Sequence, residues 1–282
     1  MEITIPARDG YELGASVHEP NGRADRTVIL SSGVGFVKEF YEDFASFLSK
    51  EGYRVVLYDY RGTGESAPNG IEGFDSTLTE WGTLDLNGVY DWVRDQYPDD
   101  DLVAFGHSIG CLLIGMSDHV EALDASVFVT PPHAYWGNWP GTHKLWMIAV
   151  MYGVIPGATH LAGYFPGRTL GFGEDLPRGV ALEWAKWCRS RDYLFDHLDE
   201  QQLKGYDKFR VPTLVWSFED DLYAPPESVR AALNHYPNTP MSHREVAPWE
   251  VEADSIGHLG FFREQFVDTL WRDTAGWMNQ RM

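Results

Sequence analysis

The sequence contains very little cysteine: Cys111 and Cys188 are the only two among 282 residues. Two thiols are too few for a disulfide framework, which indicates a reduced protein. The first twenty residues also lack the basic segment and the apolar segment of a signal peptide. These absences together predict a cytoplasmic location.

Long apolar runs and an excess of basic charge are missing as well. The longest uninterrupted apolar run covers residues 145–155 and is closed by Pro156. A bilayer span needs roughly 18 residues, so no transmembrane segment is expected. The 22 basic residues are outnumbered by 42 acidic ones, for a formal net charge of −20. Because this charge repels phosphate backbones, we expect no nucleic-acid partner.

What the sequence does contain is the composition of a folded globular protein, with 44% hydrophobic and 23% charged residues. In the first half, apolar runs that are typical of buried strands alternate with amphipathic segments that are typical of helices. Strands are predicted at 26–33, 53–62, 101–108 and 125–132. Helices are predicted at 37–52, 79–98 and 109–120. Strict alternation implies crossover connections and a parallel sheet, so the fold class is α/β.

The alternation stops at residues 133–208. This segment is rich in Gly and Pro, shows no clear strand, and contains five of the eleven tryptophans. The alternation resumes with a strand at 211–221, a helix at 226–236, a strand at 242–248 and a last helix at 259–279. The simplest interpretation is one α/β domain over residues 1–282, with residues 133–208 inserted as a helical cap.

The pattern G-x-S-x-G occurs once, as GHSIG, from Gly106 to Gly110. In a nucleophile elbow, the serine sits on a sharp turn between a strand and a helix, and the glycines relieve crowding there. Here the pattern follows the apolar strand LVAF and precedes an apolar helix start, which is the context that an elbow requires. Ser108 is therefore the candidate nucleophile.

A serine hydroxyl needs a histidine to accept its proton and an acid to orient that histidine. In α/β folds that carry a nucleophile elbow, the partners follow along the chain in the order Ser, Asp or Glu, His. His258 lies in the Gly-flanked segment SIGHLGFF, between the last predicted strand and the last helix, and is the candidate base.

The candidate acid lies at the end of the strand VPTLVWSF, where Glu219, Asp220 and Asp221 follow one another. Asp221 is favoured because its D-x-x-x-P spacing to Pro225 matches the acid turn of the fold, with Asp220 as the alternative and then Glu219. Three adjacent carboxylates cannot all be buried in ionised form, so the other two are expected to face solvent.

These segments resemble the α/β-hydrolase family, in its branch of serine aminopeptidases and monoacylglycerol-lipase-like enzymes. The segment LSSGVGFVKEFYEDFASFLSKEGYRVVLYDYRGTGES matches the strand, oxyanion loop, helix and D-x-x-G-x-G-x-S segment of that branch. The segments YWGNWPG, SFEDDLYAPPESV and IGHLGFF are similar to a bacterial group of predicted α/β hydrolases. The resemblance implies a mostly parallel sheet of eight strands, flanked by helices.

The resemblance also implies an oxyanion hole formed by the backbone N–H groups of Val34 and Ile109. Such donors are fixed in place before charge develops on the substrate. The family loop usually starts with His-Gly, where this chain has Ser32 and Gly33. The sequence therefore leaves open how this loop is held.

The cap is rich in aromatic residues and methionine, which suit an apolar substrate pocket. The residues expected to bind substrate are His133, Trp136, Trp139, Trp146 and Met147. The leading hypothesis is a serine hydrolase that cleaves an apolar carboxylic ester through an acyl-Ser108 intermediate. The alternatives are a thioesterase or acyltransferase that uses the same acyl-enzyme, and a non-catalytic binding protein.

The expected partner is a small-molecule acyl ester or thioester, and the sequence does not indicate an oligomeric state. No metal or organic cofactor is expected, because the sequence shows no cluster of His, Cys and Asp at ligand spacing and no phosphate-binding loop.

Overall fold

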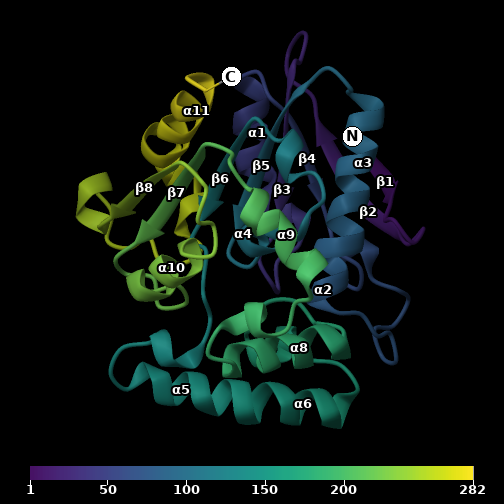
Figure 1. Cartoon of the computed structure of the whole chain (residues 1–282), viewed down its shortest axis with the longest axis vertical. Coiled ribbons are helices and arrows are strands. Elements are labelled where there is room, and N and C mark those ends of the chain that lie inside the picture. The colour runs from purple at the N-terminus through teal and green to yellow at the C-terminus, as the bar shows by residue number, and fades with distance from the viewer. Residues whose placement is uncertain (282) are drawn as a thin grey trace.

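The computed structural model describes residues 1–281, which form one mixed sheet with helices on both faces and a helical layer across one end (Figure 1). The sheet has eight strands in the order β1-β2-β4-β3-β5-β6-β7-β8. The strands are β1 (Glu2–Pro6), β2 (Glu12–His18), β3 (Arg26–Ser31), β4 (Arg54–Tyr58), β5 (Asp101–His107), β6 (Ala125–Val129), β7 (Thr213–Phe218) and β8 (Met241–Val246). β1 and β2 run antiparallel to their neighbours, and all pairs from β4 to β8 are parallel. The predicted α/β class and mostly parallel sheet are confirmed.

Side chains alternate between the two faces of the central strands, as the two-residue period of a strand requires. Val28 and Val103 belong to one apolar cluster, whereas Ile29 and Ala104 belong to the other. Each face is covered by helices, so the strands are buried on both sides. This burial explains why they read in the sequence as continuous apolar runs.

The helices of the main body are α1 (Glu42–Lys50), α2 (Leu78–Glu80), α3 (Leu86–Gln96), α4 (Gly110–Leu113), α9 (Glu200–Lys208), α10 (Pro226–Leu233) and α11 (Arg272–Asn279). The helix predicted at 79–98 is built from α2, a π-helical turn at Trp81–Asp85, and α3. The last predicted helix is regular only in α11. Its start is a series of short turns, in which the adjacent residues Phe261 and Phe262 both pack against Phe44.

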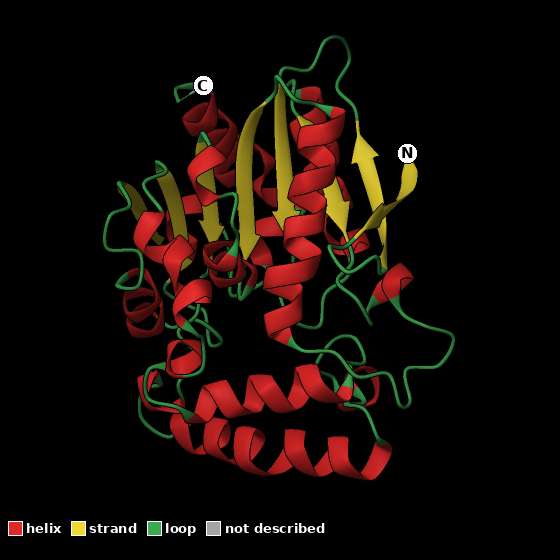
Figure 2. Ribbon diagram, turned by 45° about the vertical axis from the view of Figure 1, so that its right-hand side comes forward, coloured by secondary structure: helices red, strands yellow, loops and turns green. Residues whose placement is uncertain are grey.

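The inserted segment forms the layer across the end of the molecule (Figure 2). Its helices are α5 (His143–Ala149), α6 (Ile155–Ala162), α7 (Gly167–Leu170) and α8 (Arg178–Arg189). The last part of the segment, α9, packs on the main body instead. There the Tyr206 hydroxyl donates to the Leu112 carbonyl at 2.7 Å, and a Cβ on Gly205 would lie 2.2 Å from the Gly115 carbonyl oxygen.

The helix of the outer layer is longer than the sequence indicates. α5, a π-helical turn at Val150–Val154 and α6 join into one helix, His143–Ala162. Pro156 does not end it, because this proline lies just after the π-helical turn, where the regular i→i−4 hydrogen-bond ladder is already interrupted. By length and composition alone, this 20-residue helix, which contains an 18-residue window with a mean hydropathy of 1.4, could cross a membrane. The expectation of no transmembrane segment rested on the shorter apolar run at residues 145–155. One such helix is weak evidence for a membrane span.

Candidate active site

Ser108 lies directly after β5, at a sharp turn into α4, and its φ of 54° is left-handed. Its two flanking glycines are required by close contacts. A Cβ on Gly106 would lie 2.6 Å from the Cα of Cys111, and a Cβ on Gly110 would lie 2.2 Å from the Ser31 carbonyl oxygen. A strained serine of this kind has the geometry of a nucleophile elbow.

His258 and Asp221 form a hydrogen-bonded line with Ser108. His258 Nε2 is 2.9 Å from Ser108 Oγ, and His258 Nδ1 is 2.8 Å from Asp221 Oδ2. The other carboxylate oxygen of Asp221 accepts from the backbone N–H groups of Tyr223 at 2.7 Å and Ala224 at 2.9 Å. All three side chains come from loops at the carboxyl ends of parallel strands, which is where sites in open α/β sheets form. The arrangement suits proton removal from a serine hydroxyl.

The two other carboxylates of the acid turn have different surroundings. Glu219 is exposed, as expected. The expectation that Asp220 faces solvent is wrong: Asp220 is half-buried, and it accepts from the N–H groups of Ile256 and Gly257, both at 2.9 Å. These two residues directly precede His258. The two N–H groups satisfy the charge of the half-buried Asp220 carboxylate. In return, Asp220 holds the loop that carries His258.

Val34 and Ile109 both line the cavity beside Ser108, and their backbone N–H groups have no hydrogen-bond acceptor among residues 1–281. Ile109 follows Ser108, and Val34 lies in the loop after β3. Two unoccupied donors beside a serine are what an oxyanion hole requires.

A buried network that no sequence motif marks links three parts of this site. The Gly33 N–H donates to the Tyr41 hydroxyl at 3.0 Å, and that hydroxyl donates to His107 Nδ1 at 2.8 Å. His107 Nε2 then donates to the His258 carbonyl at 3.1 Å. Burial lowers the pKa of His107 well below its usual value, which keeps the ring neutral. His107 occupies a free position of the G-x-S-x-G pattern, so nothing in the motif marks it.

An apolar cavity of about 270 Å³ opens beside Ser108 and His258. It includes three of the residues expected to bind substrate, Trp139, Trp146 and Met147. The other walls come from the oxyanion loop, the cap and the acid turn, and include Phe36, Val150, Met151, Phe172, Trp184, Tyr193, Tyr223 and Leu259. No Asp, Glu, Lys or Arg is among the described residues that line it.

Two expected substrate-binding residues, His133 and Trp136, do not line this cavity. Pro132 and Ala134 line it on either side of His133, whose ring instead lies against the ring of His235, 5.6 Å away between centroids. The segment around His133 therefore lines the cavity as expected, but the His133 side chain does not.

His133, Asp192 and His235 come together from distant parts of the sequence, so ligand spacing along the chain gives no sign of this cluster. Asp192 Oδ1 lies 3.9 Å from His133 Nε2 and 3.4 Å from His235 Nε2. The Asn138 amide donates to His133 Nδ1 at 3.0 Å, so the neutral ring carries its proton on Nε2, the nitrogen that a metal would need. The group therefore suits hydrogen bonding better than metal binding.

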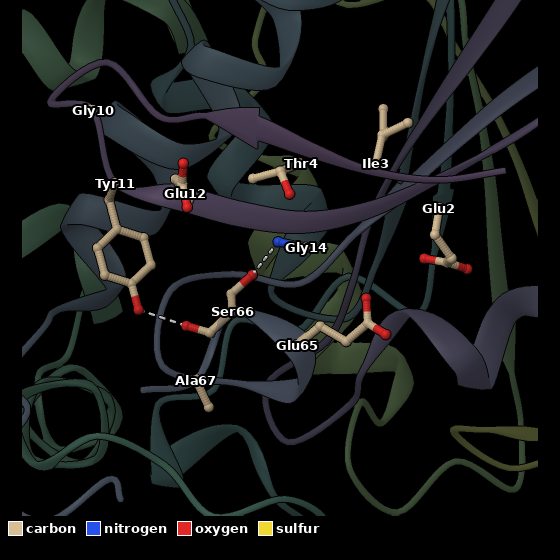
Figure 3. Close-up of a pocket in the computed structure, with 10 residues that line it drawn as sticks. All are labelled: Glu2, Ile3, Thr4, Gly10, Tyr11, Glu12, Gly14, Glu65, Ser66 and Ala67. Carbon is tan, nitrogen blue, oxygen red and sulfur yellow. Dashed lines mark hydrogen bonds between the residues drawn. The ribbon is translucent and has the colours of Figure 1, made fainter. Parts of the chain in front are cut away.

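A larger hollow of about 670 Å³ lies beside the β1–β2 hairpin (Figure 3). It shares no lining residue with the cavity beside Ser108. Three carboxylates, Glu2, Glu12 and Glu65, line it, and Ser66 is held there by hydrogen bonds with Tyr11 and Gly14. It contains no nucleophile next to a base, so the smaller cavity is the better candidate site.

Comparison with known proteins agrees with this geometry. The model of the Alpha/beta hydrolase family matches residues 28–269. Among curated proteins, lysophosphatidylserine lipase of Macaca fascicularis is 39% identical over 64 residues, which are 22% of this chain and only 14% of that lipase.

Two solved structures share the fold over nearly the whole chain. An esterase of Pyrococcus furiosus is 18% identical, with a TM-score of 0.65, and the match covers 100% of this chain and 91% of that one. A soluble variant of monoglyceride lipase from Saccharomyces cerevisiae, in complex with a substrate analog, is 14% identical, with a TM-score of 0.70 and coverage of 99% and 94%.

Proposed function

Because the chain belongs to the alpha/beta hydrolase family, we propose that it hydrolyses apolar carboxylic esters through an acyl-Ser108 intermediate. The observation that supports this most directly is the line from Ser108 through His258 to Asp221, with contacts of 2.9 and 2.8 Å at the mouth of an apolar cavity. The names of the esterase and the lipases among its relatives are consistent with that chemistry.

In the first step, Ser108 Oγ attacks the ester carbonyl carbon while His258 Nε2 accepts the hydroxyl proton. Negative charge develops on the former carbonyl oxygen, which accepts from the N–H groups of Val34 and Ile109. Asp221 accepts from Nδ1–H of His258 and stabilises the imidazolium that forms. The tetrahedral intermediate then collapses, the bond to the alcohol oxygen breaks, and His258 returns its proton to the leaving alcohol.

In the second step, a water molecule gives a proton to His258 Nε2 and attacks the acyl carbon. Collapse of this second intermediate breaks the bond to Ser108 Oγ, which takes the proton back from His258 and releases the acid. The same pair of N–H groups stabilises both intermediates.

The apolar walls of the cavity favour an uncharged acyl group as the part of the substrate that binds there. These walls are aromatic rings, methionines and aliphatic side chains, so a carboxylate or phosphate placed against them would lose its hydration without gaining a Lys or Arg partner. An acyl chain or aromatic acid would instead gain about 25 cal/mol for each Å² of apolar surface removed from water.

The proposal is tested with a fluorophosphonate probe and a series of p-nitrophenyl esters. We expect the probe to add to Ser108, as peptide mass spectrometry would show, and Ser108→Ala to lose both labelling and hydrolysis. Attachment of the probe to a different serine in the unmodified protein would contradict the assignment. Faster turnover of matched thioesters would indicate that the natural leaving group is a thiol and not an alcohol, with the same acyl-Ser108 intermediate.

A further inference from the structure

The loop that carries Val34 is not held by the side chain at its start. The Ser32 hydroxyl is buried and has no hydrogen-bond partner within the described chain. The loop is a tight turn, in which the Phe36 N–H donates to the Gly33 carbonyl at 3.3 Å. Gly35 has a φ of 82°, as the third residue of a type II turn requires. Tyr41 holds one end of this turn through the Gly33 N–H, at 3.0 Å.

The other end of the turn is held by the cap. A cap segment at residues 165–176, here called the cap loop, is closed at its base by paired backbone hydrogen bonds of 2.9 Å between Phe165 and Leu176. Within it, the Phe172 N–H donates to the Gly167 carbonyl at 2.9 Å. The tip of the cap loop, residues 171–173, lines the same cavity as Val34 and Ser108.

The cap loop and the oxyanion loop touch backbone to backbone. The Glu174 N–H donates to the Gly35 carbonyl at 2.9 Å. A Cβ on Gly173 would lie only 2.3 Å from that carbonyl oxygen, and a Cβ on Gly35 would lie 2.8 Å from the Phe172 carbonyl oxygen. Glycine is therefore needed on both sides, because any side chain would force the two loops apart.

We propose that the cap loop is a positioning device for the oxyanion hole. By donating to the Gly35 carbonyl, it fixes the turn in which Val34 directs its N–H at the site, so the hole is complete only while the cap loop is seated. This inference rests on the proposed function for its catalytic consequence. The mechanical link between the two loops does not depend on that function.

The location of the two anchors explains why this contact controls Val34. One anchor holds the Gly33 N–H and the other holds the Gly35 carbonyl, so the peptide unit that carries the Val34 N–H lies between two fixed points. Losing the second anchor leaves that unit held only by the long turn bond from the Phe36 N–H to the Gly33 carbonyl, at 3.3 Å, so its N–H can shift. Removal of one oxyanion donor typically costs about 10² to 10³ in turnover, and a donor that is only misplaced costs part of that.

The chain offers a matched pair of variants for the test, Gly173→Ala and Gly171→Ala. Both glycines lie at the cap-loop tip with positive φ, 90° and 76°, so both substitutions strain the backbone. Apart from its neighbours along the chain, no heavy atom of the described residues lies within 4 Å of a Cβ on Gly171, whereas a Cβ on Gly173 would strike Gly35. The pair therefore separates the contact between the loops from local strain.

Three readouts are measured on each variant: kinetics with p-nitrophenyl butyrate, inhibition by an alkyl trifluoromethyl ketone, and amide hydrogen exchange of a peptide that covers residues 32–38. Relative to Gly171→Ala, we expect Gly173→Ala to lower kcat and the ketone affinity by about 10- to 100-fold, with KM within threefold. Exchange at residues 32–38 should also be faster in Gly173→Ala.

Gly35→Ala tests the contact from the opposite side. We expect the double variant with Gly173→Ala to lose little more than either single variant, because both remove the same contact. This variant also keeps the inference testable if Gly173→Ala fails to fold.

The inference is overturned if the matched variants agree within twofold in kcat, ketone affinity and exchange at residues 32–38. Absence of ester hydrolysis by the unmodified protein would instead contradict the proposed function. The exchange data would then still decide whether the cap loop holds the oxyanion loop.

Discussion

At the scale of single residues, the acid turn shows how adjacent carboxylates acquire different roles. Asp221 is buried against His258, Asp220 binds the backbone before His258, and Glu219 is exposed. Bulk charge is the same at all three positions. Any difference between their amide variants therefore reports on geometry.

Asp221→Asn should reduce kcat by up to about 10⁴, the loss seen when the acid of other triads is changed in this way. The asparagine would no longer stabilise the imidazolium or select the same tautomer of His258. Steady-state kinetics on a short p-nitrophenyl ester would measure the loss, with Glu219→Gln as a control expected to stay within twofold. A mild Asp221→Asn beside a crippling Asp220→Asn would show that the acid is Asp220.

Asp220→Asn should reduce kcat by about tenfold, a smaller effect with a different cause. The amide oxygen can still accept one of the two N–H groups at 256 and 257, but its NH₂ would face the other, which leaves a half-buried donor unpaired. Kinetics and amide exchange of residues 252–260 would be measured together. Unchanged exchange in that segment would contradict the positioning role.

Local patterns found the candidate nucleophile, base and acid, because each lies in a short signature: GHSIG, the D-x-x-x-P turn, and a Gly-flanked histidine. The contacts of Asp220, Tyr41 and His107 could not be found in this way. Each joins segments that are far apart in sequence, 66 residues for Tyr41 and His107, so only the folded chain brings them together.

At the scale of elements, the helix that begins with α5 has two different faces. Met147, Val150 and Met151 line the cavity, whereas Leu145, Tyr152 and Leu161 are exposed. The sequence indicated an aromatic and methionine-rich cap but could not assign its residues to a face, because the helix is apolar nearly all round. Met147, which lines the cavity, and Leu145, which is exposed, are therefore alike in the sequence, and only the folded helix separates them.

Met147→Ala should change the acyl-chain preference, since the lost methylene and thioether contacts are worth about 1 to 3 kcal/mol in an apolar pocket. We expect the ratio of kcat/KM for long against short p-nitrophenyl esters to shift by about tenfold. Met116→Ala is the matched control, because Met116 is equally buried, at 4% against 3% exposed, but does not line the cavity. It should lower stability by about 2 to 5 kcal/mol and leave the ratio unchanged. Equal ratios in both variants would argue against an acyl site beside Met147.

At the scale of the whole molecule, several histidines are held neutral by burial. Burial lowers the pKa of His133 to about 4, and it also lowers the pKa values of His107 and His235. In the unfolded chain each would titrate near 6.5, so the unfolded state binds more protons below that pH. Their contribution to stability is therefore complete above pH 6.5 and is lost as the pH falls toward 4.

We expect His133 by itself to lower the free energy of unfolding by about 3 kcal/mol as the pH falls from 6.5 to 4, because its pKa is about 4 in the folded protein. Urea titrations at several pH values would measure this contribution as the difference between the unmodified protein and His133→Gln, because glutamine does not titrate. A slope that is unchanged in this variant would mean that His133 is already protonated in the folded protein.

The separation of Ser108 and His258 along the chain, 150 residues, also bears on biosynthesis. A growing polypeptide emerges from the ribosome in sequence order, and its early strands can pair before the later ones exist. The serine is then present without a base, and the cap must emerge before β7 and β8 can extend the sheet. By the proposed mechanism, the nascent protein would be inert toward esters until the last two strands have joined the rest.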